Sequence, residues 1–382
     1  MRTILIVAAL LLTGCASPTV AEMQGRSTST AAQQRLTPDG LTDVLADARK
    51  RVAESLEGRT GFTPPSGSVA AQHRGGTIAF IGADLGNGGI NTVGQAVAEA
   101  AQAIGWQVTQ LDGKGNAQGR TQALNQAVAL RPLGIVLGGF DATEQASTIK
   151  QAAEAGIPVV GWHAGATPGP MPAAGVFTNV TTDPLEVAWL AAAYAVADSG
   201  GRAGVVVLTD SQYEIAVRKA KAMEEYVKLC SGCTVLSYED SPIEDADARM
   251  PSLVSTLLQR NGDRLGYLLG VNGNYFGGAK SALRDAGRPA TGPPMSVAAG
   301  DGDAAEFQRV RTGDYQAATV AEPMLLQGWQ LVDELNRAIA GAAPSGFVAK
   351  PALITRATVP AGPVFDPPSG YREIYRKAWG QS

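Results

Sequence analysis

The chain has 382 residues, of which 45% are apolar, and it carries a formal net charge of −4. This length exceeds what one ordinary hydrophobic core holds, and the apolar content is enough to fill two, so we expect two lobes. The basic residues are dispersed and the balance is slightly acidic, which excludes the concentrated positive charge of a nucleic-acid-binding protein. Nucleic acid is therefore not an expected partner.

The first residues are typical of an export signal. Arg2 supplies a positive charge, Ile4 to Leu12 form an apolar run too short to span a bilayer, and Leu12-Thr13-Gly14-Cys15 resembles a bacterial lipobox. We expect residues 1–14 to be removed and Cys15 to carry lipid, which would anchor an exported protein at the extracytoplasmic, periplasmic face of the cell membrane. An ordinary signal peptide with an incidental cysteine is the alternative.

Residues 15–75 are expected to form the lipid anchor and a flexible tether. Residues 16–40 are rich in Ser, Thr, Ala and Gln, a composition that buries too little apolar surface to offset the entropy of ordering. The segment 42–56 has apolar residues at helical spacing and could dock on the folded part. Pro64-Pro65-Ser66-Gly67 then resumes a linker.

The stretch from Gly76 to Trp106 predicts a strand, a loop and a helix. Thr77 to Gly82 is a short apolar run, and from Ile90 the apolar residues recur at steps of three and four. The loop between them, Ala83 to Gly89, would lie at the carboxyl edge of a parallel sheet, where open α/β folds bind their ligands.

Strand and helix patterns alternate from there onward, and the run restarts after residue 180. This predicts an α/β protein with two doubly wound parallel-sheet lobes. Strands are expected near residues 77–82, 107–111, 133–138, 157–162, 176–180, 203–208, 234–238, 266–270, 296–300 and 317–321, and the helices between them include 118–130, 142–155, 184–197 and 213–229.

Several short motifs lie at the strand ends and turns of residues 76–360. They are Thr77 to Gly82, the turn with Asn87, Gly134 to Leu137, Ala155 to Val160, Asn272 before Gly277-Gly278-Ala279, and Gly300-Asp301-Gly302. In this order they resemble the type I periplasmic binding proteins, in particular the ribose and sugar-binding branch. The resemblance implies two lobes joined by a three-crossover hinge that close on a small polar ligand, which a membrane permease with an ATPase then imports.

The resemblance also implies the boundaries of the lobes. The N-terminal lobe would comprise 76–180 plus 323–349 and the C-terminal lobe 181–322 plus 350–360, followed by a C-terminal tail, 361–382. The crossovers would lie near Asn179 to Asp183, near Glu322-Pro323 and near Ala349 to Pro351.

Ligand positions carried over to the first lobe are Asn87, Trp162 and His163, with Phe140 and Asp141 at another strand end. Asn87 would offer an amide to the ligand, although a turn residue is an equal reading. His163 and Ala164 match the Asp-Arg pair that the sugar binders commonly carry after this predicted strand, and Trp162 precedes them at the strand's carboxyl end; Trp162 could instead close the core.

In the second lobe Asn272 matches the family's ligand asparagine, Asp301 its acidic partner, and Glu322 stands where a glutamine is common. Glu322 could instead point away and pair with a base at the hinge. Arg218 approximates the family's second-lobe arginine, with the local alignment offset by one residue. Further aromatic rings could provide a stacking surface or simply pack; these are Tyr213, Tyr275 and Phe276.

Enzymatic motifs are incomplete in this sequence. Gly86 to Asn91 begins like a dinucleotide fingerprint but has Asn91 where the last glycine belongs, and Gly113-Lys114-Gly115 lacks the spacing of a phosphate loop. The chain has two histidines and no clustered metal spacing. We expect no enzyme activity, no cofactor and no metal site; a hydrolase is the rival outside the fold.

Cys230 and Cys233 are expected to form a structural disulfide, because an exported protein folds outside the reducing cytosol. The pair follows a predicted helix, and a helix C-terminus disfavours the thiolate that redox catalysis needs.

The resemblance therefore implies a monomeric, lipid-anchored substrate-binding protein of an ABC importer, with a sugar or polyol as its ligand. A receptor for chemotaxis or sensor signalling is the alternative within the fold. The pocket lacks the family's arginine at Ala164 and gains Glu322, so it should reject acids, with Arg218 the one cation placed near it. A cationic, amino-substituted or aromatic ligand is the second choice.

Overall fold

The computed structural model describes residues 43–56, 65, 67, 69–73 and 75–381. The expected signal peptide, the lipidation site Cys15 and the predicted disorder of residues 16–40 all lie outside the described residues. Within the described part, no helix has both the length and the apolar character needed to cross a membrane.

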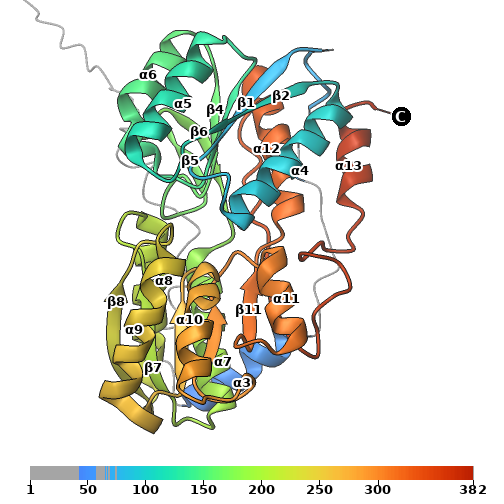
Figure 1. The fold of residues 1–382 in the computed structure, drawn as a ribbon. Helices are drawn as coiled ribbons and strands as arrows, with labels where there is room; N and C mark the ends of the chain where they lie inside the picture. The colour runs from blue at the N-terminus through green and yellow to red at the C-terminus, as the bar shows by residue number, and fades with distance from the viewer. Residues whose placement is uncertain (1–42, 57–64, 66, 68, 74, 382) are drawn as a thin grey trace, which may run out of the picture. The chain divides into compact units, whose positions relative to one another are not determined.

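The first lobe is built on a six-stranded sheet of order β2-β1-β3-β4-β6-β5, in which only β5 runs antiparallel to its neighbour. Its strands are β1 (Thr77–Gly82), β2 (Gln107–Asp112), β3 (Ile135–Gly138), β4 (Val159–Trp162), β5 (Gly169–Met171) and β6 (Val176–Val180). Its helical segments are α4 (Gly88–Ile104), α5 (Ala117–Ala129), η2 (Ala142–Gln145), α6 (Ala146–Glu154), η3 (Pro172–Ala174) and α12 (Met324–Ile339), the last of which packs against α4 (Figure 1).

The second lobe has a six-stranded sheet of order β12-β11-β10-β9-β7-β8, with β12 antiparallel at one edge. Its strands are β7 (Gly204–Thr209), β8 (Thr234–Asp240), β9 (Tyr267–Gly270), β10 (Met295–Ala298), β11 (Ala318–Ala321) and β12 (Ala352–Thr355). Its helical segments are α7 (Pro184–Asp198), α8 (Glu214–Leu229), α9 (Ala246–Asn261), η4 (Gly262–Arg264), α10 (Asn274–Asp285) and α11 (Ala304–Thr312).

The predicted architecture of two doubly wound parallel sheets is confirmed. The boundaries differ by one or two residues where backbone chemistry intervenes: β4 begins at Val159 rather than Ile157, because Pro158 has no N–H to donate to a neighbouring strand. The two antiparallel edge strands, β5 and β12, were not predicted from the sequence.

The chain passes between the two sheets at three places. It leaves β6 of the first sheet for α7, leaves β11 of the second sheet for α12, and returns from α12 to β12. The residues of these passages are 181–183, 322–323 and 340–351. Because the first two passages lie at the carboxyl ends of β6 and β11, residues that follow those strands lie close to both lobes.

Helix α3 (Val44–Leu56) packs against α7 and β12 of the second lobe. The Arg51 guanidinium lies 5.6 Å from the ring centroid of Trp189, and Oδ2 of Asp47 accepts hydrogen bonds from Arg51 and from the Tyr226 hydroxyl. The docking that the sequence suggested for this helix is therefore present.

The segment expected to be a C-terminal tail contains a helix, α13 (Tyr371–Ala378), which packs against α12 (Figure 1). The indole of Trp379, directly after this helix, stacks on Trp329 with 5.5 Å between ring centroids, and its Nε1 donates to Asp333 at 2.8 Å. The chain end is therefore part of the first lobe's core.

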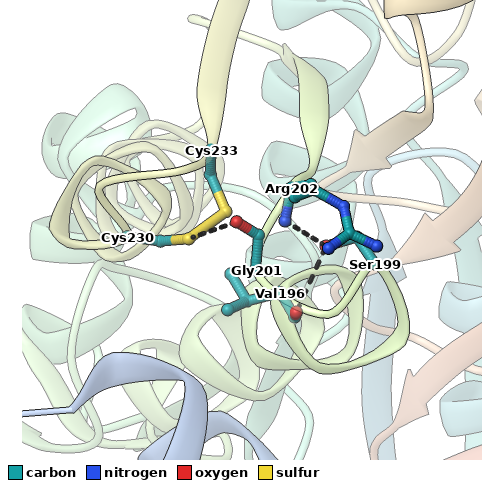
Figure 2. Close-up of a disulfide and its surroundings, with 6 residues drawn as sticks. All are labelled: Val196, Ser199, Gly201, Arg202, Cys230 and Cys233. Carbon is teal, nitrogen blue, oxygen red and sulfur yellow. Dashed lines mark hydrogen bonds between the residues drawn. A yellow bond between two sulfur atoms is a disulfide. The ribbon is translucent and has the colours of Figure 1, made fainter.

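Cys230 and Cys233 are joined by a disulfide at the end of α8 (Figure 2). Cys230 Sγ lies 3.5 Å from the carbonyl oxygen of Gly201, in the turn that precedes β7. The bond closes a loop with a sequence separation of three residues.

Candidate functional site

A cavity lies between the carboxyl edges of the two sheets and is lined by both lobes. Its volume is about 70 Å³, room for on the order of five water molecules. The first lobe contributes Asp84, Asn87, Ile90, Gly139, Trp162 and His163, and the second Tyr213, Ile215, Ala216, Lys219, Ile243, Glu244, Val271, Asn272, Asn274 and Asp301.

Asn87 lines the cavity from the loop between β1 and α4. Its side-chain oxygen accepts hydrogen bonds from the backbone N–H groups of Gly89 (3.0 Å) and Ile90 (3.1 Å), so the residue also caps α4. No protein partner is present for its Nδ2 among the described residues. The turn reading and the cavity reading of Asn87 are therefore compatible.

Trp162 and His163 follow the end of β4 and stack on each other, with 3.8 Å between ring centroids. Trp162 Nε1 donates to Oε1 of Gln327 at 3.0 Å, which fixes the indole from α12. His163 takes a left-handed backbone conformation with φ of 53°, which is uncommon for a residue other than glycine. Both side chains are buried and both line the cavity.

Lys219 reaches the cavity from α8, and its ammonium nitrogen lies 3.0 Å from Oε1 of Glu322. The second oxygen of Glu322 lies 3.1 Å from His163 Nε2. Burial would raise the pKa of Glu322, but Lys219 and then His163 outweigh it and hold that pKa well below its usual range. Glu322 is therefore ionised at neutral pH, within a buried group of opposite charges.

Asn272 and Asp301 lie at the ends of two neighbouring strands, β9 and β10. Asn272 Nδ2 donates to Oδ2 of Asp301 at 2.9 Å, and its Oδ1 accepts from the Asn274 N–H. Burial raises the pKa of Asp301, while His163 and Lys219 act in the opposite direction. The second oxygen of Asp301 has no protein hydrogen bond among the described residues.

Tyr213, Glu244 and Asp84 also line the cavity. The Tyr213 hydroxyl donates to Oε1 of Glu244, while Oε2 of Glu244 is buried without a partner in the described part of the chain. Burial is the main cause that raises the pKa of Glu244.

Five of the predicted ligand residues do not line the cavity: Phe140, Asp141, Arg218, Tyr275 and Glu322. Phe140 and Tyr275 are fully buried, and the Tyr275 hydroxyl donates to the Ser241 carbonyl. Phe276, the other candidate for stacking, is fully buried in the second lobe as well.

Two of the remaining three, Asp141 and Glu322, lie at the junction of the lobes. Asp141 accepts from the Glu214 N–H of the second lobe, and Glu322 lies behind Lys219 and His163. The expectation that Arg218 supplies the nearby cation is corrected, because the cation in the cavity lining is its neighbour, Lys219.

Lys219 is the main residue that sequence reasoning missed. A signal was present: Ile215, Ala216 and Lys219 recur at helical spacing and form the face of α8 that lines the cavity, whereas Arg218 lies outside that face. The one-residue offset of the alignment pointed to the same correction.

His163, Asp301 and Glu322 place ligand atoms within 4.8 Å of one another, as metal-binding residues do. The Lys219 ammonium, 3.0 Å from Glu322, already supplies positive charge to this group. The donor set therefore fits an ion-paired cluster better than a cation site.

The periplasmic binding protein domain family matches residues 78–343. No curated protein sequence matches the chain.

Several solved structures share the fold. A solute-binding protein of an ABC transporter from Agrobacterium vitis, described with alpha-D-tagatopyranose, is 19% identical with a TM-score of 0.67. The match covers 75% of this chain and 97% of that protein. A sugar ABC transporter protein from Yersinia enterocolitica is 21% identical with a TM-score of 0.65. The match covers 80% of this chain and 91% of that protein.

The binding protein of the arabinose ABC transporter from a Shewanella species, described with arabinofuranose, is 18% identical with a TM-score of 0.64. The match covers 79% of this chain and 96% of that protein. Such likeness shows the fold, and the family match covers most of the chain. The chain therefore belongs to the periplasmic binding protein family and has its type I fold of two α/β lobes around an interlobe cavity.

Proposed function

We propose that this protein is the lipid-anchored substrate-binding component of an ABC importer and that it captures a neutral sugar or polyol between its lobes. The family is one of non-enzymatic substrate-binding proteins. The observation that carries the proposal is the composition of the cavity lining, which offers unused hydrogen-bond donors beside unused acceptors.

The unused donors are the Asn87 amide and the remaining N–H groups of Lys219, and the unused acceptors are one oxygen each of Asp301 and Glu244. A hydroxyl group both donates and accepts, so a polyhydroxylated ligand can satisfy such a mixed lining. A buried donor or acceptor left without a partner would cost on the order of 1–3 kcal/mol, which gives the site selectivity for hydroxyl-rich compounds.

The apolar part of the lining supports the same class of ligand. Trp162, Ile90, Ile215 and Val271 offer surfaces against which the C–H faces of a sugar ring can pack. The proteins of similar fold described with bound tagatose and arabinose support the choice of a monosaccharide. His163 and Ala164 stand where sugar binders commonly carry an Asp-Arg pair, so the ligand need not be one of those sugars.

The test is calorimetric titration of the purified protein, after removal of co-purified small molecules by unfolding and refolding. The panel holds neutral pentoses, hexoses and polyols, their acids, and their amino-substituted forms. Binding of at least one neutral compound with a Kd in the micromolar range or below is expected. Binding of acids alone, or turnover of any compound, would contradict the proposal.

A further inference from the structure

Glu322 is fully buried at the passage from β11 of the second lobe to α12 of the first. Its Oε1 accepts from Lys219, and its Oε2 is shared by His163 Nε2, the Gln327 amide (3.2 Å) and the Thr182 N–H (3.4 Å). These partners come from both lobes, and one of them, Thr182, belongs to another of the passages between the lobes. Glu322 itself does not line the cavity.

Two of these partners do line the cavity, and they come from opposite lobes: His163 follows β4 and Lys219 belongs to α8. Gln327 extends the connection, because its amide oxygen holds the Trp162 indole. One buried carboxylate therefore orients three side chains of the lining, Trp162 through Gln327 and the other two directly.

The charge of Glu322 also decides what Lys219 presents to a ligand. A buried ammonium group without a counter-ion attracts an anion strongly, whereas one paired at 3.0 Å with a carboxylate is largely neutralised. Asp301 adds a further carboxylate at the same end of the cavity. With Glu322 ionised, this end holds more negative than positive formal charge, and a ligand carboxylate placed there would face repulsion.

We propose that Glu322 sets the charge specificity of the site without touching the ligand: by neutralising Lys219 and orienting it together with His163, it makes the cavity accept neutral polyols and exclude sugar acids. This inference rests on the proposed function, since it concerns which members of the sugar class bind. Lys219 is the residue through which Glu322 acts, and Glu322 is a positioning residue.

The substitution Glu322→Gln tests the idea because it keeps the shape and one oxygen of the side chain but removes its charge. Lys219 then loses the carboxylate that is paired with it, and its positive charge beside the cavity is less neutralised. Affinities are measured by calorimetry for matched pairs, galactose with galacturonate and ribose with ribonate. The expected result is a shift of at least tenfold in the ratio of acid to neutral affinity, in favour of the acid.

Two further variants separate this role from general damage. Glu334→Gln changes another buried glutamate, on α12 and bonded to Ser345 outside the cavity, and should leave the ratio unchanged. The double variant Glu322→Gln with Lys219→Met should lose the gain in acid binding. An acid-to-neutral ratio in Glu322→Gln within twofold of the parent's, or a gain that survives in the double variant, would overturn the inference.

The outcomes also distinguish this inference from the proposed function. If the parent protein binds no neutral sugar, the proposed function is wrong. The role of Glu322 is tested separately, by whether acid binding appears in Glu322→Gln. Should Glu322→Gln fail to fold, Lys219→Gln replaces it. That variant leaves Glu322 without its cation and is expected to shift preference at least tenfold from galactose toward galactosamine; an unchanged preference would overturn the inference.

Discussion

Asp141 of the first lobe caps a helix of the second lobe. Its Oδ2 accepts a hydrogen bond of 2.9 Å from the backbone N–H of Glu214, the first residue of α8. Tyr213, at the N-cap position of that helix, provides no side-chain cap of its own. The first N–H groups of a helix need an acceptor and attract negative charge. This hydrogen bond therefore stabilises the closed arrangement of the two lobes, and it is lost when they part.

The same contact predicts a pH dependence of ligand binding. Burial raises the pKa of Asp141 to about 6, the Glu214 N–H and Arg120 lower it, and Glu214 and Glu144 raise it. Parting of the lobes exposes the carboxyl group, so its pKa falls back toward 3.8. The carboxyl group therefore binds its proton more tightly in the closed form than in the open form. Protonation of Asp141 favours closure at low pH, and this stabilisation of the closed form is lost as the pH rises through about 6.

Ligand affinity should accordingly increase as the pH is lowered from 8 to 5. The variant Asp141→Asn mimics the protonated group, because its amide oxygen still accepts from Glu214. It should bind at pH 8 at least as tightly as the parent and show a flatter pH profile by calorimetry. An Asn variant with the parent's full pH dependence would contradict this assignment.

Asp301→Ala should weaken ligand binding by about ten- to a hundredfold. The change leaves a hydrogen-bond donor of the ligand unpaired in a buried site, and it also removes the acceptor of Asn272, a cost on the order of 1–3 kcal/mol. Asp314→Ala, which changes a partly exposed aspartate paired with Lys280, is the control. Unchanged affinity by calorimetry would remove Asp301 from the site.

The sequence predicted the parallel core of both lobes because buried strands and amphipathic helices carry strong local patterns. The first strand, Thr77–Gly82, and the loop with Asn87 are examples. Helix α13 escaped prediction because its stability comes from packing: Trp379 stacks on Trp329, 50 positions earlier in the chain. The local sequence of an eight-residue helix does not reveal a packing partner so far away in the chain.

The site was predictable only in part for a related reason. Asn272 and Asp301 follow predicted strands, whose carboxyl ends must meet at one edge of a sheet, so their proximity followed from topology. Lys219 sits on a helix, where a shift of one residue turns a side chain by about 100°. An alignment offset by one residue therefore selected Arg218, whereas the structure shows that Lys219 lines the cavity.

Cys15→Ser should release the protein from membranes. The motivation is the apolar run that ends in Leu12-Thr13-Gly14-Cys15, and the expected cause is loss of the acyl chains that provide the anchor. The measurement is fractionation of cells that express the parent or the variant. A variant that fractionates with membranes as the parent does would show that lipidation at this residue is wrong.

The disulfide between Cys230 and Cys233 should add little to stability. It closes a loop with a separation of three residues, for which the entropic contribution is on the order of 2 kcal/mol or less. The protein carrying both Cys230→Ser and Cys233→Ser should therefore fold, with a slightly lower Tm. Two free thiols in the unfolded, unreduced parent would contradict the bond itself.

Gly89→Ala should hinder closure of the lobes. Gly89 lies in the first turn of α4, and a Cβ built there would overlap Oδ2 of Asp301 in the second lobe. The same substitution in an isolated helix is favourable by about 1 kcal/mol, so the first lobe should keep its stability. The effect should instead appear as an at least tenfold loss of ligand affinity. In small-angle scattering, the ligand should induce less compaction of the variant than of the parent.

Gly277→Ala is the matched control and should bind as the parent does. Gly277 is an exposed helical glycine of α10, and a Cβ built there would meet nothing closer than 3.3 Å. A Gly89→Ala protein that binds and compacts like the parent would show that the approach of α4 to Asp301 is not part of the ligand-bound form.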